Sequence, residues 1–116
     1  MPHVRTVFVE DPGIREFLRT NKTTIREAFA DILGYPPEDV AFYPQKISSG
    51  DAELADNLLP LEFVVDSGTR SLDSESECVL TMKLTILKRC EGADKLHFGI
   101  WLVSHAKNEF LEHKPS

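Results

Sequence analysis

The stretch MPHVRTVFVE (residues 1–10) decides how the fold of this chain begins. After the first residues its side chains alternate between polar and apolar and are rich in β-branched and aromatic types, which predicts a β-strand over residues 3–10. Successive side chains of a strand point to opposite faces, so His3 is expected to point away from Pro2. One face of the strand is expected to carry Pro2, Val4, Thr6 and Phe8.

The next segment predicts a helix and a second strand. Asp11 can cap a helix that begins at Pro12, and Gly34, followed by two prolines, ends it. Apolar residues recur between these signals at helical spacing: Ile14, Phe17, Leu18, Ile25, Ala28, Phe29 and Ile32. The stretch VAFYPQKI (40–47) then predicts a strand, in which Pro44 indicates an edge position or a bulge because it has no amide hydrogen to donate.

The second half of the chain repeats this order. Residues 48–60 are expected to form a loop with about one helical turn. The stretch LEFVVDS (61–67) predicts a buried strand, and Ser74 with Glu77 forms a capping box for a second helix that ends before Gly92. Its apolar stripe is expected to contain Val79, Leu80, Met82, Leu84, Ile86 and Leu87. The near-continuous apolar stretch LHFGIWLV (96–103) predicts a fourth strand, buried on both faces.

Two βαβ units predict an α+β fold in one domain that spans residues 1–116. Right-handed crossovers place both helices on one face of a four-stranded mixed sheet. The other face would expose many apolar side chains in a chain of this size. We therefore expect that face to be buried against other subunits.

Composition excludes several classes of function. A formal net charge of −6 with scattered basic residues argues against a nucleic-acid-binding protein. No apolar run is long enough to span a membrane and no signal-peptide pattern occurs, so no membrane association is expected and the cytoplasm is the expected location.

The cysteines point to reduced thiols. Cys78 and Cys90 fall in one predicted helix, where twelve residues separate them by about 18 Å, too far for a disulfide. Neither CxxC nor HExxH spacing occurs, so neither a metal site nor a cofactor is predicted.

Pro2 is the first candidate for chemistry. Initiator methionine is usually removed before a small residue, which would leave Pro2 with a free secondary amine. An α-amine titrates near pH 8, and desolvation or a nearby cation lowers its pKa. Such an amine can act as a general base near neutral pH.

Several motifs together resemble the tautomerase superfamily, the group of macrophage migration inhibitory factor, 5-carboxymethyl-2-hydroxymuconate isomerase and 4-oxalocrotonate tautomerase. These motifs are MPH at the start, GYPPEDVA (34–41), GTRSLDSES (68–76) and GADKLHFGIWL (92–102). The likeness extends over nearly the whole length and is closest to a small bacterial branch of the superfamily.

The resemblance implies a homotrimer with a pocket at each subunit boundary and Pro2 as the catalytic group. Arg70 matches the family's arginine-bearing segment and would bind the carboxylate of a small anionic carbonyl or enol substrate. The alternative is a surface arginine near a helix N-terminus.

The chain departs from the family at other pocket positions. Tyr35, Ala41 and Tyr43 stand where family members carry lysine or arginines, and Lys46 is a candidate substitute cation. His97 and Tyr43 are candidate pocket residues, for which a packing role is as well supported. Val64 is a further candidate substrate contact.

Three functions remain open at this point. The first is a cofactor-independent tautomerase or isomerase with neutral Pro2 as base. The second is a lyase, hydratase or decarboxylase with protonated Pro2 as acid. The third is a non-catalytic trimeric binding module.

Overall fold

The computed structural model describes residues 2–54, 56, 58–68, 74–104 and 108–116. Along the chain the elements are β1 (His3–Val9), α1 (Pro12–Leu33), η1 (Pro37–Asp39), β2 (Ala41–Ile47), α2 (Ser49–Leu54), β3 (Leu61–Asp66), α3 (Glu75–Arg89), η2 (Ala93–Lys95), β4 (Phe98–Val103) and β5 (Asn108–His113).

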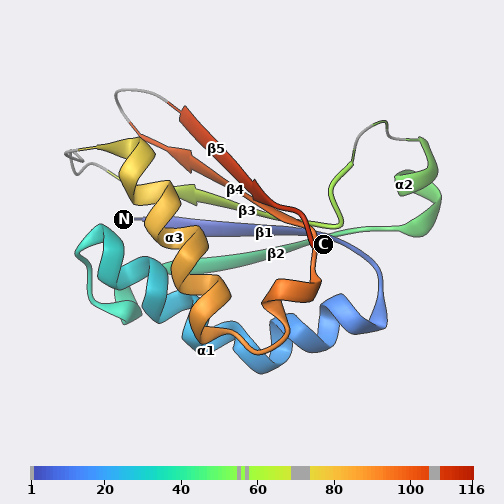
Figure 1. Cartoon of the computed structure of the whole chain (residues 1–116), viewed down its shortest axis with the longest axis horizontal. Helices are drawn as coiled ribbons and strands as arrows, with labels where there is room; N and C mark the ends of the chain where they lie inside the picture. Colours follow the sequence, from blue (N-terminus) through green and yellow to red (C-terminus); the bar gives the residue numbers. More distant parts are fainter. Residues whose placement is uncertain (1, 55, 57, 69–73, 105–107) are drawn as a thin grey trace.

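The sheet is mixed, with the strand order β2-β1-β3-β4-β5. β1 pairs in parallel with β2, and β3 pairs in parallel with β4, while β1 and β3 are antiparallel. Both long helices lie on one face of this sheet (Figure 1). The predicted pair of βαβ units with its helices on one face is therefore confirmed.

A fifth strand was not expected from the sequence. β5 pairs antiparallel with β4, with Trp101 opposite Phe110. The stretch NEFLEH carries only two apolar residues, so its strand pattern is weak. Pairing with β4, and not a hydrophobic pattern of its own, explains why these residues form a strand.

The local signals of α1 act as the sequence predicts. The Asp11 side chain accepts a hydrogen bond from the Gly13 amide at 2.7 Å, and Gly34 ends the helix with φ 80°. β2 is an edge strand, which explains how Pro44 is tolerated within it.

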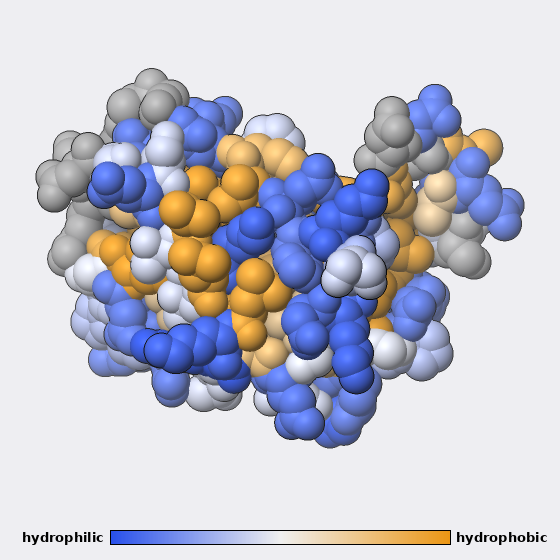
Figure 2. All heavy atoms as spheres, viewed as in Figure 1, coloured by the Kyte–Doolittle hydropathy of each residue, from blue (hydrophilic) through white to orange (hydrophobic). Residues whose placement is uncertain are grey.

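The core lies between the helices and the sheet. Phe29 of α1, Phe63 of β3 and Phe98 of β4 are fully buried, with ring centroids 5.6 and 6.2 Å apart along the series. From α3, Val79, Met82 and Ile86 join this core. The predicted stripe is too wide, however, because Leu80 and Leu84 are exposed. Figure 2 shows apolar side chains reaching the surface over α3.

The helix-free face of the sheet is only partly covered. Trp101 packs on Phe110 with ring centroids 4.5 Å apart, yet it remains 38% exposed, and Tyr43 of β2 is 54% exposed. The prediction that β4 is buried on both faces is thus wrong for Trp101 within one chain. Among the described residues, this face therefore keeps large apolar side chains exposed.

Candidate active site

Pro2 lies at the amino end of β1, on the helix-covered side of the sheet. Its side chain is less than 2% exposed, whereas His3, next along the strand, is exposed on the opposite face. The Pro2 carbonyl accepts a hydrogen bond from the Ala41 amide at 3.2 Å, which ties the start of β1 to β2. The predicted alternation of Pro2 and His3 is confirmed.

A buried serine stands opposite Pro2. Because His3 pairs with Asp66, the next residue of the β3 segment, Ser67, comes beside Pro2. Ser67 is fully buried, and its amide donates to the Val103 carbonyl at 3.0 Å. The Tyr35 hydroxyl donates to the Ser67 carbonyl at 3.2 Å. The Ser67 hydroxyl itself makes no hydrogen bond within the described part of the chain.

A buried carboxylate extends this row of residues. Ser104 follows β4 beside Ser67, since Asp66 pairs with Val103. The Ser104 hydroxyl donates to Glu75 Oε1 at 3.2 Å, and Glu75 is only 9% exposed at the first turn of α3. A helix N-terminus favours such a negative charge.

We call these residues the proline-edge cluster: Pro2, Tyr35, Ser67, Glu75 and Ser104. From Pro2 to Ser104 the cluster spans two strand spacings, about 10 Å. It joins hydroxyl donors and a carboxylate to the residue whose nitrogen becomes basic when Met1 is removed. The sequence did not predict Ser67, Glu75 and Ser104 as site residues. Strand pairing brings them together, and no local sequence pattern indicates which strands pair.

Arg70 lies outside the described residues, together with residues 69 and 71–73. The last described residue before this segment is Gly68, whose amide donates to Asp66 Oδ1 at 2.8 Å. The first described residue after it is Ser74, the N-cap of α3. Both flanks of the arginine-bearing segment thus adjoin residues of the proline-edge cluster.

Tyr43 and Val64 come together on the helix-free face. They line a hollow of about 520 Å³ with His3, Arg5, Asp66 and Val103. There His3 Nε2 lies 3.7 Å from Asp66 Oδ2, and the His3 ring meets Tyr43 edge-on. This hollow shares the sheet end with Pro2 but opens on the opposite face.

Lys46 and His97 lie at the far end of the sheet. Lys46 pairs with Phe8 in the strand register, and its Nζ is 3.4 Å from Glu10 Oε2. His97 Nε2 is 2.6 Å from Glu112 Oε2. About 20 Å of strand separates Phe8 from Pro2. Within one chain, therefore, neither side chain approaches Pro2, because β2 runs parallel to β1 and ends where β1 ends.

Among the described residues no group of three His, Cys, Asp or Glu side chains could hold a metal ion. Likewise, no helix in the described ranges is both long and apolar enough to cross a membrane.

Comparison with known proteins supports the fold. No protein-family model and no curated protein matches the sequence. Among solved structures, Pt0534 inactivated by 2-oxo-3-pentynoate has a TM-score of 0.56 at 16% identity, covering 88% of this chain and 84% of that one. Native fused 4-OT has a TM-score of 0.55 at 12% identity, with coverages of 88% and 85%.

A third structure, the wild-type asymmetric trimer of F6 fused 4-OT, has a TM-score of 0.54 at 13% identity, with coverages of 90% and 89%. At these identities the likeness concerns the fold. It extends over most of every chain compared, in agreement with the doubled βαβ unit described above. The chain therefore has the fold of the tautomerase superfamily.

Proposed function

We propose that this protein, once Met1 is removed, is a cofactor-independent tautomerase of small enolisable 2-oxo acids. The observation that carries the proposal is the burial of Pro2 beside the unpartnered hydroxyl of Ser67, in a fold shared with tautomerase structures. While Met1 is attached, the Pro2 nitrogen belongs to an amide and has no basic lone pair. Removal of Met1 turns it into a secondary amine at a buried residue, beside the hydroxyl of Ser67.

The proposed reaction moves one proton. The Pro2 amine takes a proton from the carbon beside the ketone, and the electrons of that C–H bond form the enolate. Pro2 then returns the proton to oxygen or to the far carbon of the conjugated system. Ser67 would donate a hydrogen bond to the developing oxyanion, and Arg70 would bind the substrate carboxylate.

In this proposal a neighbouring subunit contributes the remaining candidate residues to the site. F6 fused 4-OT is a trimer, and we propose a homotrimer for this chain as well. A second copy packed at the sheet end that carries Pro2 would bring its own Tyr43, Val64, Lys46 or His97 towards a proline site that these residues do not reach within one chain.

The first test compares three forms of the protein with phenylenolpyruvate as substrate. These are the processed protein with a free Pro2, a form whose terminus is blocked by retained Met1, and Pro2→Ala. We expect turnover by the processed form, a trace by the alanine variant with its primary amine, and none by the blocked form. Ketonisation is followed by ultraviolet absorbance, and intact mass establishes the terminus. Equal rates in processed and blocked forms would remove Pro2 from the mechanism.

A covalent probe tests the same nitrogen independently. Pt0534 was inactivated by 2-oxo-3-pentynoate, an alkynyl ketone that accepts amine nucleophiles. The processed form should gain the mass of the whole reagent on its N-terminal peptide, and the blocked form should gain none. Labelling of other residues alone would count against a nucleophilic Pro2.

Arg70→Ala separates substrate binding from a surface role. Loss of one contact made mainly in the transition state should slow turnover by about 10²-fold. A surface arginine should change the free energy of unfolding by less than about 0.5 kcal/mol. Unchanged kinetics would indicate that Arg70 is a surface arginine with no role in substrate binding.

The alternative functions predict different outcomes. A lyase, hydratase or decarboxylase that uses protonated Pro2 would lose activity as pH rises through the Pro2 pKa, whereas a base mechanism gains activity there. A processed trimer that turns over no enol and resists the alkynyl ketone would favour the binding module.

A further inference from the structure

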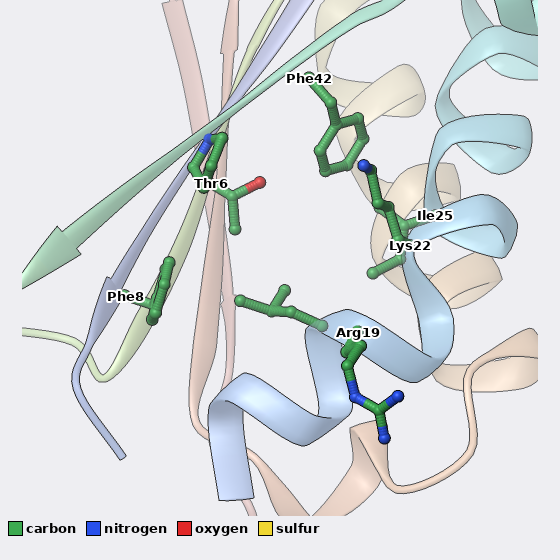
Figure 3. A pocket seen from close by; sticks show the side chains of 8 residues that line it. Thr6, Phe8, Arg19, Lys22, Ile25 and Phe42 are labelled. Carbon is green, nitrogen blue, oxygen red and sulfur yellow. The ribbon is translucent and has the colours of Figure 1, made fainter. Parts of the chain in front are cut away.

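A second cavity lies between α1 and the edge formed by β1 and β2, with a volume of about 170 Å³ (Figure 3). Its walls are mainly apolar and partly aromatic. They comprise Phe8 of β1, Leu18 and Ile25 of α1, and Phe42 and Pro44 of β2. Three polar side chains, Thr6, Arg19 and Lys22, complete the lining.

This cavity is separate from the proline-edge cluster, and no residue belongs to both. Thr6 follows Pro2 by four residues on the same face of β1, which corresponds to about 13 Å along the strand. The tautomerase mechanism proposed above makes no use of the cavity.

Every charged side chain that lines the cavity is cationic, although the protein carries a formal net charge of −6. Arg19 is engaged by Glu16, with its Nη2 2.6 Å from Glu16 Oε1. That pairing raises the pKa of Arg19 and lowers the pKa of Glu16 through hydrogen bonding and charge attraction. Lys22, by contrast, has no ion-pair partner among the described residues. It is therefore the cation that a ligand can neutralise.

Thr6 provides a second polar contact. It is 2% exposed, and its hydroxyl has no hydrogen-bond partner within the described chain. Figure 3 shows the Thr6 hydroxyl, from β1, and the Lys22 ammonium, from α1, directed into the space beside Phe42. A buried hydroxyl without a partner is unusual, and a ligand oxygen placed here would satisfy both groups.

Phe42 also contacts a cation of α1. The Arg26 guanidinium carbon lies 5.6 Å from the Phe42 ring centroid, a cation–π contact. The aromatic wall of the cavity is therefore fixed by a residue that follows Lys22 by one helical turn on α1.

We propose that this cavity binds a small aromatic monocarboxylate, with the carboxylate between Lys22 and Thr6 and the ring among the apolar walls. The volume suits one six-membered ring, because an apolar protein cavity of about 150 Å³ accommodates benzene. Charge selects the anion, since a neutral or cationic ring would leave Lys22 unpaired or repelled.

The test is a titration of the ¹⁵N-labelled protein with benzoate, followed by amide chemical shifts. Benzyl alcohol and benzylamine serve as the neutral and cationic probes. We expect saturable benzoate shifts at residues 18–25, 42 and 43, and binding of both other probes at least about tenfold weaker. Equal binding of the three probes, or no saturation, would overturn the proposal.

Lys22→Met removes the charge and keeps most of the stem, and Lys95→Met at an exposed position of η2 is the matched control. We expect about five- to tenfold weaker benzoate binding for the first variant and unchanged binding for the second. Lys22→Arg should restore affinity, and Thr6→Val should weaken it without loss of the amide spectrum. Undiminished binding to folded Lys22→Met would contradict the assignment.

Pro2→Ala distinguishes this site from the active site. Benzoate binding and its shifts should survive this change, because the cavity lies about 13 Å away along β1. Shifts confined to Ser67 and its neighbours, abolished in Pro2→Ala, would show that benzoate occupies the proline-edge cluster and would overturn the second site.

Discussion

At the scale of single residues, Ser67 allows a role in stability to be tested separately from a role in chemistry. Its hydroxyl has no hydrogen-bond partner among the described residues. A buried hydroxyl without a partner is costly, so removing it should not weaken the fold. The same hydroxyl stands beside Pro2, where a substrate oxygen would accept its hydrogen bond.

We predict that Ser67→Ala keeps or raises the free energy of unfolding, by up to about 1 kcal/mol, and slows enol turnover by about 10²-fold. Urea unfolding and steady-state kinetics measure the two effects. Ser76→Ala, at an exposed position in α3 where the hydroxyl donates to Glu109 Oε1 at 3.1 Å, is the control for turnover and should leave it unchanged. A Ser67 variant with normal turnover would exclude this residue from catalysis.

A second prediction for a single residue concerns the buried thiol of Cys90, which should make the free energy of unfolding depend on pH. Burial raises the pKa of its thiol from 9.0 to about 11, although Arg89 opposes the shift. The folded state therefore binds more protons than the unfolded state between these values, and stability falls as pH rises through them.

The expected loss attributable to Cys90 is about 2 to 3 kcal/mol between pH 9 and 11. Because lysines and tyrosines titrate in the same range, the measurement is the difference in pH slope between the wild type and Cys90→Ala. Identical slopes would mean that the folded state does not raise the pKa of the thiol.

At the scale of elements, α1 depends on its first turn. Asp11 accepts the Gly13 amide at 2.7 Å, and the helix carries buried residues along its whole length, from Ile14 to Leu33. Fraying at its start would uncover Ile14 and Phe17, so the cap acts on packing as well as on the backbone.

Asp11→Ala should lower the free energy of unfolding by about 1 kcal/mol, because the amide loses its acceptor. Asp11→Asn is the control, since asparagine caps a helix about as well and should cost only a few tenths of a kcal/mol. Equal losses in both variants, measured by denaturant unfolding, would attribute the effect to charge instead of capping.

At the scale of the whole molecule, we expect the helix-free face of the sheet to pack against another subunit. Trp101 and Tyr43 remain exposed there, and both long helices lie on the other side of the five-stranded sheet (Figure 1). A homotrimer would bury this face and bring the far sheet ends of neighbours together.

We predict a species of three times 13.1 kDa in sedimentation at micromolar concentration. Trp101→Glu should dissociate it, because a charge would be buried at the interface. Leu84→Glu places the same charge at an exposed apolar site on α3 and should leave the trimer intact. Dissociation by the Leu84 variant alone would move the interface to the helix side.

The sequence by itself determined the elements and their order. Alternation, helical spacing, the Asp11 cap, the Gly34 stop and the edge role of Pro44 are local signals, and each acts within a few residues. For this reason the two βαβ units and the opposite orientation of Pro2 and His3 could be predicted. The expectation of a tautomerase-type fold came from the resemblance of the quoted motifs, and the solved structures agree with it.

Only the tertiary structure decided which side chains meet. The pairing of β1 with β3 and of β3 with β4 placed Ser67, and then Ser104 with Glu75, beside Pro2. It also set Lys46 and His97 at the opposite end of the sheet from Pro2, at least about 20 Å away in the same chain. Strand pairing joins residues distant in sequence through backbone hydrogen bonds that every residue offers, so no local pattern records the neighbours.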